Sequence, residues 1–431
     1  MKRVHSLSEL QLAIEKKEKD IRIEGTISDV GVLVLGDSQC LSGGRLEFKS
    51  KGLGLTSNNI LKNIIIVCPP VEQAIWNHPE IEDFGTLSMN HVQTYGQVNI
   101  IAAQGFHKGT LVAEDVHVVE ADVRGREQRP FKYAVETLQG GFNVWNRCPE
   151  NTELTVRLTN IAICTQATPV RGSGIFVSGY SESSGAGGIV KGKEISTKKI
   201  FTDGGISPAT PNLISGGVFI CYGSFFEKVV NKERVVTFGP NDMVLDLWGD
   251  VKNWHVLDQL LSYGPSAIGF VNFGNIDKLK IDAEIITRGD GSRGFNLYDG
   301  SLQELEIHSI TTHGDGSVGL QISKPLNRIT ICEDVKTYGQ SGSSLVKGVV
   351  VNLKAIAVSI KEGGIVEELN IGGSLISMGD DTPTLEVNGE IKSINVGEEI
   401  VAFGKGSNAV SVAKNVTFEA SGVNRRERHP R

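Results

Sequence analysis

The stretch Ile286-Thr-Arg-Gly289-Asp-Gly-Ser-Arg-Gly-Phe295 recurs further along the chain as Thr311-Thr-His-Gly314-Asp-Gly-Ser-Val-Gly-Leu320. Gly289 and Gly314 are 25 residues apart. The same spacing, continued in both directions, meets further glycines, with one longer gap of 40 residues between Gly339 and Gly379. The glycines in this register are Gly239, Gly264, Gly289, Gly314, Gly339, Gly379 and Gly404. A fixed period of this kind is the sequence signature of a repeat protein.

An apolar residue lies six positions after each of these glycines. These residues are Leu245, Phe270, Phe295, Leu320, Leu345, Leu385 and Val410. The segments between the turns alternate apolar with polar residues, which is typical of half-buried strands. A unit of about 25 residues is too short for a propeller blade or a two-helix repeat.

The sequence therefore predicts an all-β fold, a single-stranded right-handed parallel β-helix with coils of about 25 residues. The apolar residues would stack as an interior ladder, with Leu320 between Phe295 and Leu345. The repeated glycines would supply the positive φ angles that tight turns need. Asp290 and Asp315 are expected to be turn residues whose carboxylates accept backbone N–H groups.

The composition supports a globular repeat protein. Of 431 residues 51 are glycine, against a usual share of about 7%. The formal net charge of -7 argues against a nucleic-acid surface, and no apolar run approaches the roughly 20 residues of a membrane-spanning helix. No secretory signal pattern opens the chain, which predicts a cytoplasmic protein and leaves secretion open if a leader is missing.

The first residues predict a helix that caps the solenoid. Ser6-Leu-Ser-Glu9 has a capping-box pattern, and Ile21-Arg-Ile-Glu-Gly-Thr-Ile27 then alternates as a strand. Together with Gly52-Leu-Gly-Leu55 and the following Ser57–Ile66 stretch, this pattern resembles the pectate-lyase superfamily of right-handed parallel β-helices. The resemblance implies that fold and a carbohydrate substrate. The catalytic motifs of that superfamily are absent, since Arg129-Pro130-Phe131-Lys132 lacks its spacing and second arginine.

The predicted organisation has three parts. Residues 1–20 would form the cap helix and residues 21–420 the β-helix, with a loop-rich insertion around 140–235 where the repeat rhythm is lost. Residues 421–431, which contain four arginines, would form a basic flexible tail.

Positions seven and nine after each repeat glycine should point outward if position six points inward. Position nine is occupied by Trp248, Phe273, Tyr298 and Ser323 on consecutive coils, and position seven by Asp246, Val271, Asn296 and Gln321, followed later by Glu386. An exposed column of rings beside amides and carboxylates suits the binding of sugars. The alternative is a face that the segment 130–235 or another subunit covers.

Two functions remain open at this point. The first is a polysaccharide lyase or glycoside hydrolase with a groove on the outer face; the second is a non-catalytic solenoid that binds a glycan or self-associates through that face. The candidate catalytic residues are Asp246, Asp299 and Lys324. The candidate substrate-binding residues are Trp248, Phe273, Asn296, Tyr298, Gln321 and Arg171. We expect a carbohydrate ligand and a homo-oligomer, with no metal, no cofactor, no nucleic acid and no membrane partner.

Overall fold

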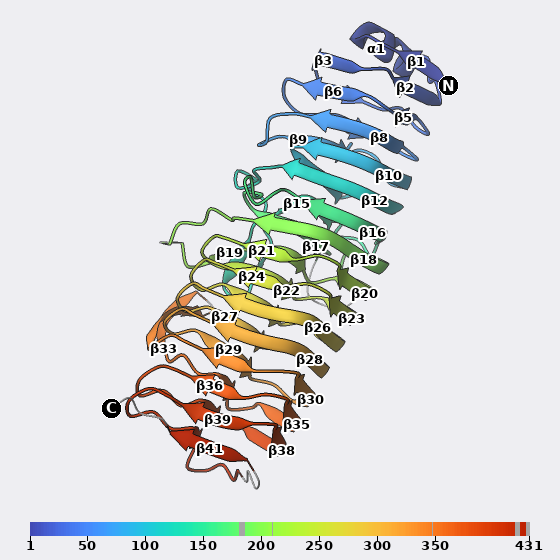
Figure 1. The fold of residues 1–431 in the computed structure, drawn as a ribbon. Coiled ribbons are helices and arrows are strands. Elements are labelled where there is room, and N and C mark those ends of the chain that lie inside the picture. Colours follow the sequence, from blue (N-terminus) through green and yellow to red (C-terminus); the bar gives the residue numbers. More distant parts are fainter. Residues whose placement is uncertain (181–185, 209, 347, 419–422, 428–431) are drawn as a thin grey trace. The chain divides into compact units, whose positions relative to one another are not determined.

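A computed structural model describes residues 1–180, 186–208, 210–346, 348–418 and 423–427. These residues form parallel strands that stack coil upon coil in two sheets, sheet A and sheet B (Figure 1). The predicted all-β parallel solenoid is thereby confirmed. The chain divides into two compact units. Unit 1 comprises Met1–Gln128, Leu138–Thr202 and Val218–Val229, and unit 2 comprises Arg129–Thr137, Asp203–Gly217 and Val230–Arg431.

In unit 1 each coil contributes to sheet A and then to sheet B. The strands of sheet A are β1 (Lys2–Val4), β2 (Asp20–Ile23), β3 (Thr26–Val30), β5 (Cys40–Ser42), β6 (Arg45–Phe48), β8 (Ile60–Val67), β10 (Asp83–Tyr95), β12 (Lys108–Glu120), β16 (Glu153–Ile163) and β18 (Ile189–Thr202). Those of sheet B are β4 (Leu33–Val34), β7 (Leu53–Leu55), β9 (Gln73–Asn77), β11 (Gln97–Ala102), β15 (Gly140–Asn146) and β17 (Ser173–Ser178). Strands β19 (Leu213–Ile220) and β20 (Ser224–Asn231) each have residues in both units.

Unit 2 has the same alternation. Its strands in sheet A are β21 (Val235–Thr237), β23 (Asp250–Val256), β24 (Leu260–Ser262), β26 (Asn275–Thr287), β28 (Ser301–Thr312), β30 (Leu326–Ile331), β31 (Val335–Thr337), β35 (Ile365–Ile371), β36 (Leu375–Ser377), β38 (Glu390–Val396), β39 (Glu399–Ala402) and β41 (Asn424–Glu427). Those in sheet B are β22 (Asp242–Leu247), β25 (Ile268–Asn272), β27 (Arg293–Leu297), β29 (Val318–Ile322), β34 (Val358–Ile360), β37 (Leu385–Val387) and β40 (Val410–Val412). Two antiparallel hairpins leave the coils, β13–β14 (Phe131–Lys132 and Val135–Thr137) and β32–β33 (Gly342–Val346 and Val349–Leu353).

The cap helix forms where the capping box predicts it. Helix α1 spans Leu7–Glu15, and the Ser6 hydroxyl accepts the Glu9 backbone N–H at 3.3 Å. This bond satisfies one of the donors that a helix N-terminus leaves without a partner. Leu10 and Ala13 are buried, and the helix packs against β1, β2 and β3. The helix therefore covers the apolar interior of the first coil.

The interior ladder is present, but one of its predicted members is wrong. Leu320 is fully buried and pairs with Phe295 on one side, as predicted, while Val358 takes the place of Leu345 on the other. Leu345 lies in the hairpin β32–β33. This hairpin fills the long interval between Gly339 and Gly379, so the position six residues after Gly339 no longer falls in sheet B.

The repeat glycines have a different role from the predicted one. None of them has a positive φ; the positive values belong to other turn glycines such as Gly291 and Gly316. A Cβ atom on Gly314 would lie 2.1 Å from the carbonyl oxygen of Gly289, and the other repeat glycines after Gly239 are similarly close to the preceding coil. They are therefore required for close backbone stacking between coils, rather than for turn conformation.

The turn aspartates accept backbone N–H groups, as predicted, but from the next coil. Asp290 Oδ1 accepts the N–H of Asp315 at 3.0 Å, and Asp315 Oδ1 accepts the N–H of Gln340 at 2.7 Å. Asp380 Oδ1 accepts the N–H of Lys405 at 2.7 Å in the same way. Each carboxylate thus ties its own coil to the coil that follows.

Two predicted boundaries are corrected. Most of residues 140–235 form strands β15 to β20 rather than a loop-rich insertion. The rhythm is lost there because the turns lengthen: Val98 pairs with Phe142, and Phe142 pairs with Ile175, so these coils contain more residues than the regular repeat. In the predicted tail, Asn424–Glu427 form strand β41, which pairs in parallel with β39. Residues 421, 422 and 428–431 of the predicted tail lie outside the described residues.

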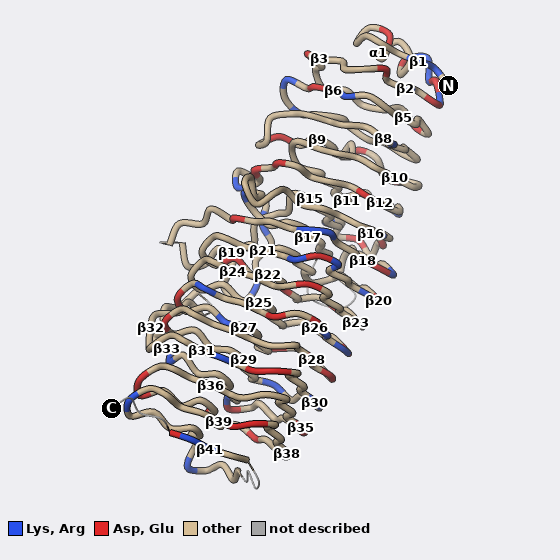
Figure 2. The backbone as a smooth tube through the Cα atoms, in the orientation of Figure 1, with Lys and Arg blue, Asp and Glu red and all other residues tan. Residues whose placement is uncertain are grey.

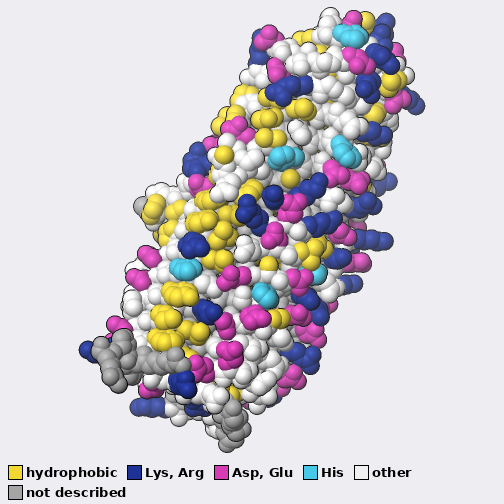
Figure 3. All heavy atoms as spheres, viewed as in Figure 1, with side chains coloured by type: hydrophobic (Ala, Val, Ile, Leu, Met, Phe, Trp, Pro, Cys, Tyr) yellow, Lys and Arg dark blue, Asp and Glu magenta, His cyan; other side chains and the backbone are white. Residues whose placement is uncertain are grey.

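The outer side of sheet A in unit 2 carries ion pairs between neighbouring coils. Lys280 Nζ lies 3.1 Å from a carboxylate oxygen of Glu306, and Arg328 Nε lies 2.9 Å from one of Glu368. Figures 2 and 3 show basic and acidic residues mixed over these strands. Opposite charges on adjacent strands stabilise their pairing modestly. Among the described residues no helix is long and apolar enough to cross a membrane.

Candidate functional site

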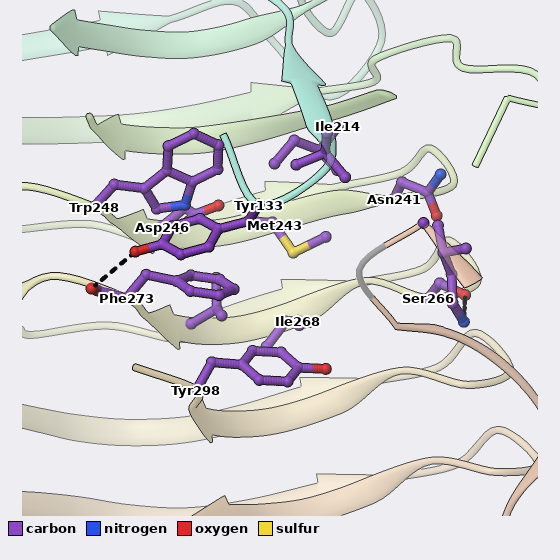
Figure 4. Close-up of a pocket in the computed structure, with 14 residues that line it drawn as sticks. Tyr133, Ile214, Asn241, Met243, Asp246, Trp248, Ser266, Ile268, Phe273 and Tyr298 are labelled. Carbon is purple, nitrogen blue, oxygen red and sulfur yellow. Dashed lines mark hydrogen bonds between the residues drawn. The ribbon is translucent and has the colours of Figure 1, made fainter. Parts of the chain in front are cut away.

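A small pocket lies on the outer side of sheet B in unit 2 (Figure 4). Its volume is about 60 Å³. Trp248, Phe273 and Tyr298 each follow directly after a strand of sheet B, so the repeat brings their rings together on three successive coils. Tyr133 completes the aromatic wall from the hairpin β13–β14, far away in the sequence.

The four rings pack against one another. The centroids of Phe273 and Tyr298 are 5.1 Å apart with the rings nearly parallel, at 16°. Tyr133 stacks on Phe273 at 4.2 Å, and its ring edge contacts Trp248 at 5.4 Å. Trp248 is only 4% exposed, whereas Phe273 and Tyr298 are half-buried, so Trp248 itself is not openly exposed. Tyr133, from the segment 130–235, packs against Trp248 and Phe273.

The turn that carries Tyr133 is strained. Tyr133 and Ala134 have φ angles of 52° and 64°, a conformation that residues with a side chain adopt at a cost of about 1–3 kcal/mol each. The Tyr133 hydroxyl donates to the carbonyl oxygen of Phe273 at 3.5 Å, and β14 pairs with Leu213 and Ile214 of β19. These contacts hold the tyrosine ring over the pocket despite the strain.

The hairpin β32–β33 forms another side of the pocket, through Leu345 and Gly348. The Ser344 hydroxyl donates to the carbonyl oxygen of Gly291 at 2.7 Å, and the Leu345 N–H donates to the Ser266 hydroxyl at 3.0 Å. Two excursions from the regular coils therefore converge on one place.

Asp246 is the carboxyl group of this pocket. It is 1% exposed, and neither of its oxygens has a hydrogen-bond partner among the residues that the structure describes. Burial raises the pKa of Asp246 well above its ordinary value, and the neighbouring Trp248 opposes this shift without reversing it. Burial therefore favours the protonated form of this carboxyl group.

Asn296 and Gln321 follow Asp246 in the same outward column but do not line the pocket. Both are buried, and Gln321 Nε2 donates to Asn296 Oδ1 at 3.4 Å. The amide nitrogen of Asn296 has no partner among the described residues. The two amides thus mainly complete the polar column between coils.

The other two candidate catalytic residues form an ion pair. Lys324 Nζ lies 3.0 Å from Asp299 Oδ1, and both side chains are more than two-fifths exposed. Neither residue lines the pocket that contains Asp246. The structure therefore does not bring the three residues into one catalytic arrangement, and their catalytic role stays a prediction.

Arg171 belongs to unit 1, whereas the other candidate residues belong to unit 2. It forms a backbone bridge with Asp122 in parallel orientation. The pKa of Asp122 is lowered, mainly by its hydrogen bond with Arg124 and in smaller part by the charge of Arg171. This placement suits a structural role.

No group of three or more histidine, cysteine, aspartate or glutamate side chains within the described ranges is arranged to hold a metal ion. Sequence reasoning missed Tyr133, Leu345 and Gly348 as pocket residues. The long interval between Gly339 and Gly379 signals the hairpin that contains Leu345, while no repeat pattern points to Tyr133.

Comparison of the chain with protein-family models, with curated proteins and with solved structures finds no significant match. The pocket itself is therefore the feature of the molecule that points to a function. Its unusual features are a strained turn, a carboxyl group without hydrogen bonds to the described residues and four clustered rings, all in one place.

Proposed function

We propose that the protein is a non-catalytic β-solenoid that binds a small ligand in the pocket of unit 2. The observation that carries this proposal is Asp246, a buried carboxyl group that faces a cavity and has no hydrogen bond to the described residues. Leaving such a group unsatisfied destabilises a protein by about 1–3 kcal/mol. The strained turn at Tyr133 adds a similar destabilisation in the same place. Local costs of this kind tend to cluster at ligand sites.

The size of the cavity limits the ligand. Pockets for drug-sized ligands have volumes of roughly 300–1,000 Å³. A cavity of about 60 Å³ admits a small group rather than a polysaccharide chain. The proposed ligand is therefore a small molecule, or one compact end of a larger one.

The proposal is tested by thermal unfolding of the protein with three classes of small molecule: alkylammonium salts, neutral alcohols and monosaccharides. A ligand that binds the native state raises the unfolding temperature in proportion to its occupancy. We expect at least one class to do so in the wild-type protein and not in Ile268→Phe, which fills the pocket with a larger side chain. The unfolding temperature of Ile268→Phe without ligand shows whether that variant folds. If no class raises the unfolding temperature, the proposal is wrong.

A carbohydrate-active enzyme of the pectate-lyase-like superfamily is the second candidate function. It is favoured by the clustered rings beside Asp246 and by the resemblance of the segment 4–67 to that superfamily. It is disfavoured by the separate ion pair of Asp299 and Lys324. A screen of polysaccharides for new reducing ends or ultraviolet-absorbing unsaturated products tests it, and Asp246→Asn should abolish any activity found.

Self-association through the aromatic face is a further part of this proposal, and light scattering tests it. Tyr133 already stacks on Phe273, and the hairpin β32–β33 lines the same pocket, so a second copy would have to contact these two segments. If a homo-oligomer forms through these segments, Tyr133→Ala should change the mass that light scattering measures. A monomer mass of the wild-type protein over a wide concentration range would exclude the homo-oligomer.

A further inference from the structure

The polar groups of the pocket wall differ in what they still can bind. Asn241 Nδ2 donates to the carbonyl oxygen of Leu213 at 3.3 Å, and the Ser266 hydroxyl accepts from Leu345 at 3.0 Å. Asp246 has no such partner among the described residues. A sugar presents several hydroxyl groups that all need partners, whereas this wall offers chiefly a single carboxyl group. The chemistry of the wall therefore favours a ligand with one charged centre and an apolar surface.

Aromatic rings around a carboxyl group are the arrangement that recognises a methylated ammonium ion. Such a cation is attracted to ring faces, and tryptophan and tyrosine attract it more strongly than other residues. In Figure 4 Trp248, Tyr133 and Phe273 lie one beside another with Asp246 next to them. The ring of Tyr133 already has a cation near it, because Lys132 Nζ lies 4.5 Å from its centroid.

We propose that this pocket binds a small methylated ammonium group, with Asp246 as its counter-ion and Tyr133, Trp248 and Phe273 as its aromatic wall. This inference rests on the proposed ligand-binding function and names the class of ligand. No other charged side chain lines the pocket among the described residues, so the charge of the ligand would be balanced by Asp246.

Binding of the cation is coupled to loss of a proton. In the empty pocket burial raises the pKa of Asp246 and so favours its protonated form, whereas a bound cation favours its carboxylate form. The balanced step is that the carboxylic acid and the ammonium ion give a carboxylate–ammonium pair and one proton released to solvent. Affinity should therefore rise with pH until Asp246 is already ionised in the empty pocket.

The test compares choline with 3,3-dimethylbutan-1-ol, a neutral molecule of the same shape, by isothermal titration calorimetry at pH 6 and pH 8. We expect choline to bind at least tenfold more tightly than the alcohol, with higher affinity at pH 8. The heat should depend on the ionisation enthalpy of the buffer, which reports proton release. Asp246→Asn should reduce the preference for choline at least tenfold, while the matched variant Asp299→Asn should retain it.

The outcomes separate the inference from the proposed function. Equal binding of the two probes would leave a ligand pocket and overturn the cation inference. A preference for choline that survives in Asp246→Asn would overturn the role of Asp246. Binding of neither probe by the wild-type protein would overturn the cation inference, and the wider ligand panel would then decide the proposed function. The unfolding temperature of Asp246→Asn, which should equal or exceed that of the wild type, shows that the variant folds.

Discussion

Asp242 and Asp246 lie four residues apart on β22 and are both buried, yet their surroundings differ. Asp242 accepts the N–H of Gly239 at 2.8 Å, the N–H of Gly204 and the hydroxyl of Ser215. Burial still raises the pKa of Asp242, to about 6, but these donors oppose the shift. Asp246 has no comparable set of donors among the described residues: only Trp248 opposes the shift, and the pKa of Asp246 is raised well above the ordinary value. Near pH 7 Asp242 is therefore ionised in the main, whereas burial favours the protonated form of Asp246 more strongly.

This difference predicts how Asp246→Asn changes the free energy of unfolding. The pKa of an aspartate in the unfolded chain is about 3.9, whereas that of folded Asp246 is higher. The stability that the proton contributes is present below about pH 4 and is lost as pH rises toward the folded pKa. Asparagine does not ionise. Within that pH window the free energy of unfolding of the variant should therefore rise relative to that of the wild type by about 1.4 kcal/mol per pH unit.

Urea unfolding at pH 5 and pH 8 measures this gain. Asp299→Asn, which removes a half-exposed partner of Lys324, is the control and should show no comparable dependence on pH. A difference between Asp246→Asn and wild type that is the same at both pH values would contradict the raised pKa of Asp246.

Gly314 predicts a second effect at the scale of one residue. A Cβ atom there would lie 2.1 Å from the carbonyl oxygen of Gly289, and the atoms that it would meet all belong to backbone, which cannot move aside as a side chain can. Overpacking of this kind costs about 1–3 kcal/mol, and Gly314→Ala should lower the free energy of unfolding by at least that amount. Gly31→Ala is the control, since its Cβ would meet no atom within 4 Å. Equal effects of the two substitutions would show that close stacking is not the reason for the repeat glycine.

At the scale of elements, the repeat register explains how much of the site was predictable. Trp248, Phe273 and Tyr298 share one repeat position, so sequence reasoning places them in one column, and the structure stacks their rings. The cover over them could not be predicted, because the contact between Tyr133 and Phe273 joins residues 140 positions apart. Long-range contacts of this kind leave no local periodicity. The glycine register predicted the wrong place for Leu345 for a related reason, because a hairpin is inserted within that coil.

The hairpin β32–β33 should be separable from the coil that carries it. Ala355, Ile356 and Ala357 are buried and continue the coil after the hairpin, so replacing residues 341–354 by a short Gly-Ser linker leaves the ladder in place. The replacement removes the hydrogen bonds of Ser344 to Gly291 and of Leu345 to Ser266. At about 0.5–1.5 kcal/mol per bond, we expect a loss of about 1–3 kcal/mol in unfolding free energy and a more accessible Trp248.

Acrylamide quenching of tryptophan fluorescence checks that accessibility. The wild-type protein and a Trp248→Phe variant of the shortened protein serve as controls, because the other tryptophans contribute to the signal. Loss of the circular dichroism of β structure after the replacement would show instead that the hairpin is needed for the coil.

At the scale of the whole molecule, the last described strand protects an edge. Strand β41 pairs with β39 in sheet A, and its side chains are exposed and mostly charged. An unprotected strand edge is a template for pairing with another chain. A chain that ends at Phe418 leaves the backbone of Glu399–Ala402 without this partner, and it should associate with rising concentration. Multi-angle light scattering of the full and shortened chains at matched concentrations checks this expectation, which a constant mass of the shortened chain would contradict.

The unequal length of the coils has a mechanical consequence. Each coil in unit 2 contacts its two neighbours through parallel pairing, so a force applied at the C-terminal end should peel coils away one at a time. An extended chain spans at most about 3.3–3.6 Å per residue, so a coil of about 25 residues releases about 80–90 Å of chain. The coil between Gly339 and Gly379, with about 40 residues, releases about 130–145 Å. In an optical trap the coils of unit 2 from Gly239 onward should therefore unravel in a regular series of steps, in which one longer step marks the position of the hairpin beside the pocket.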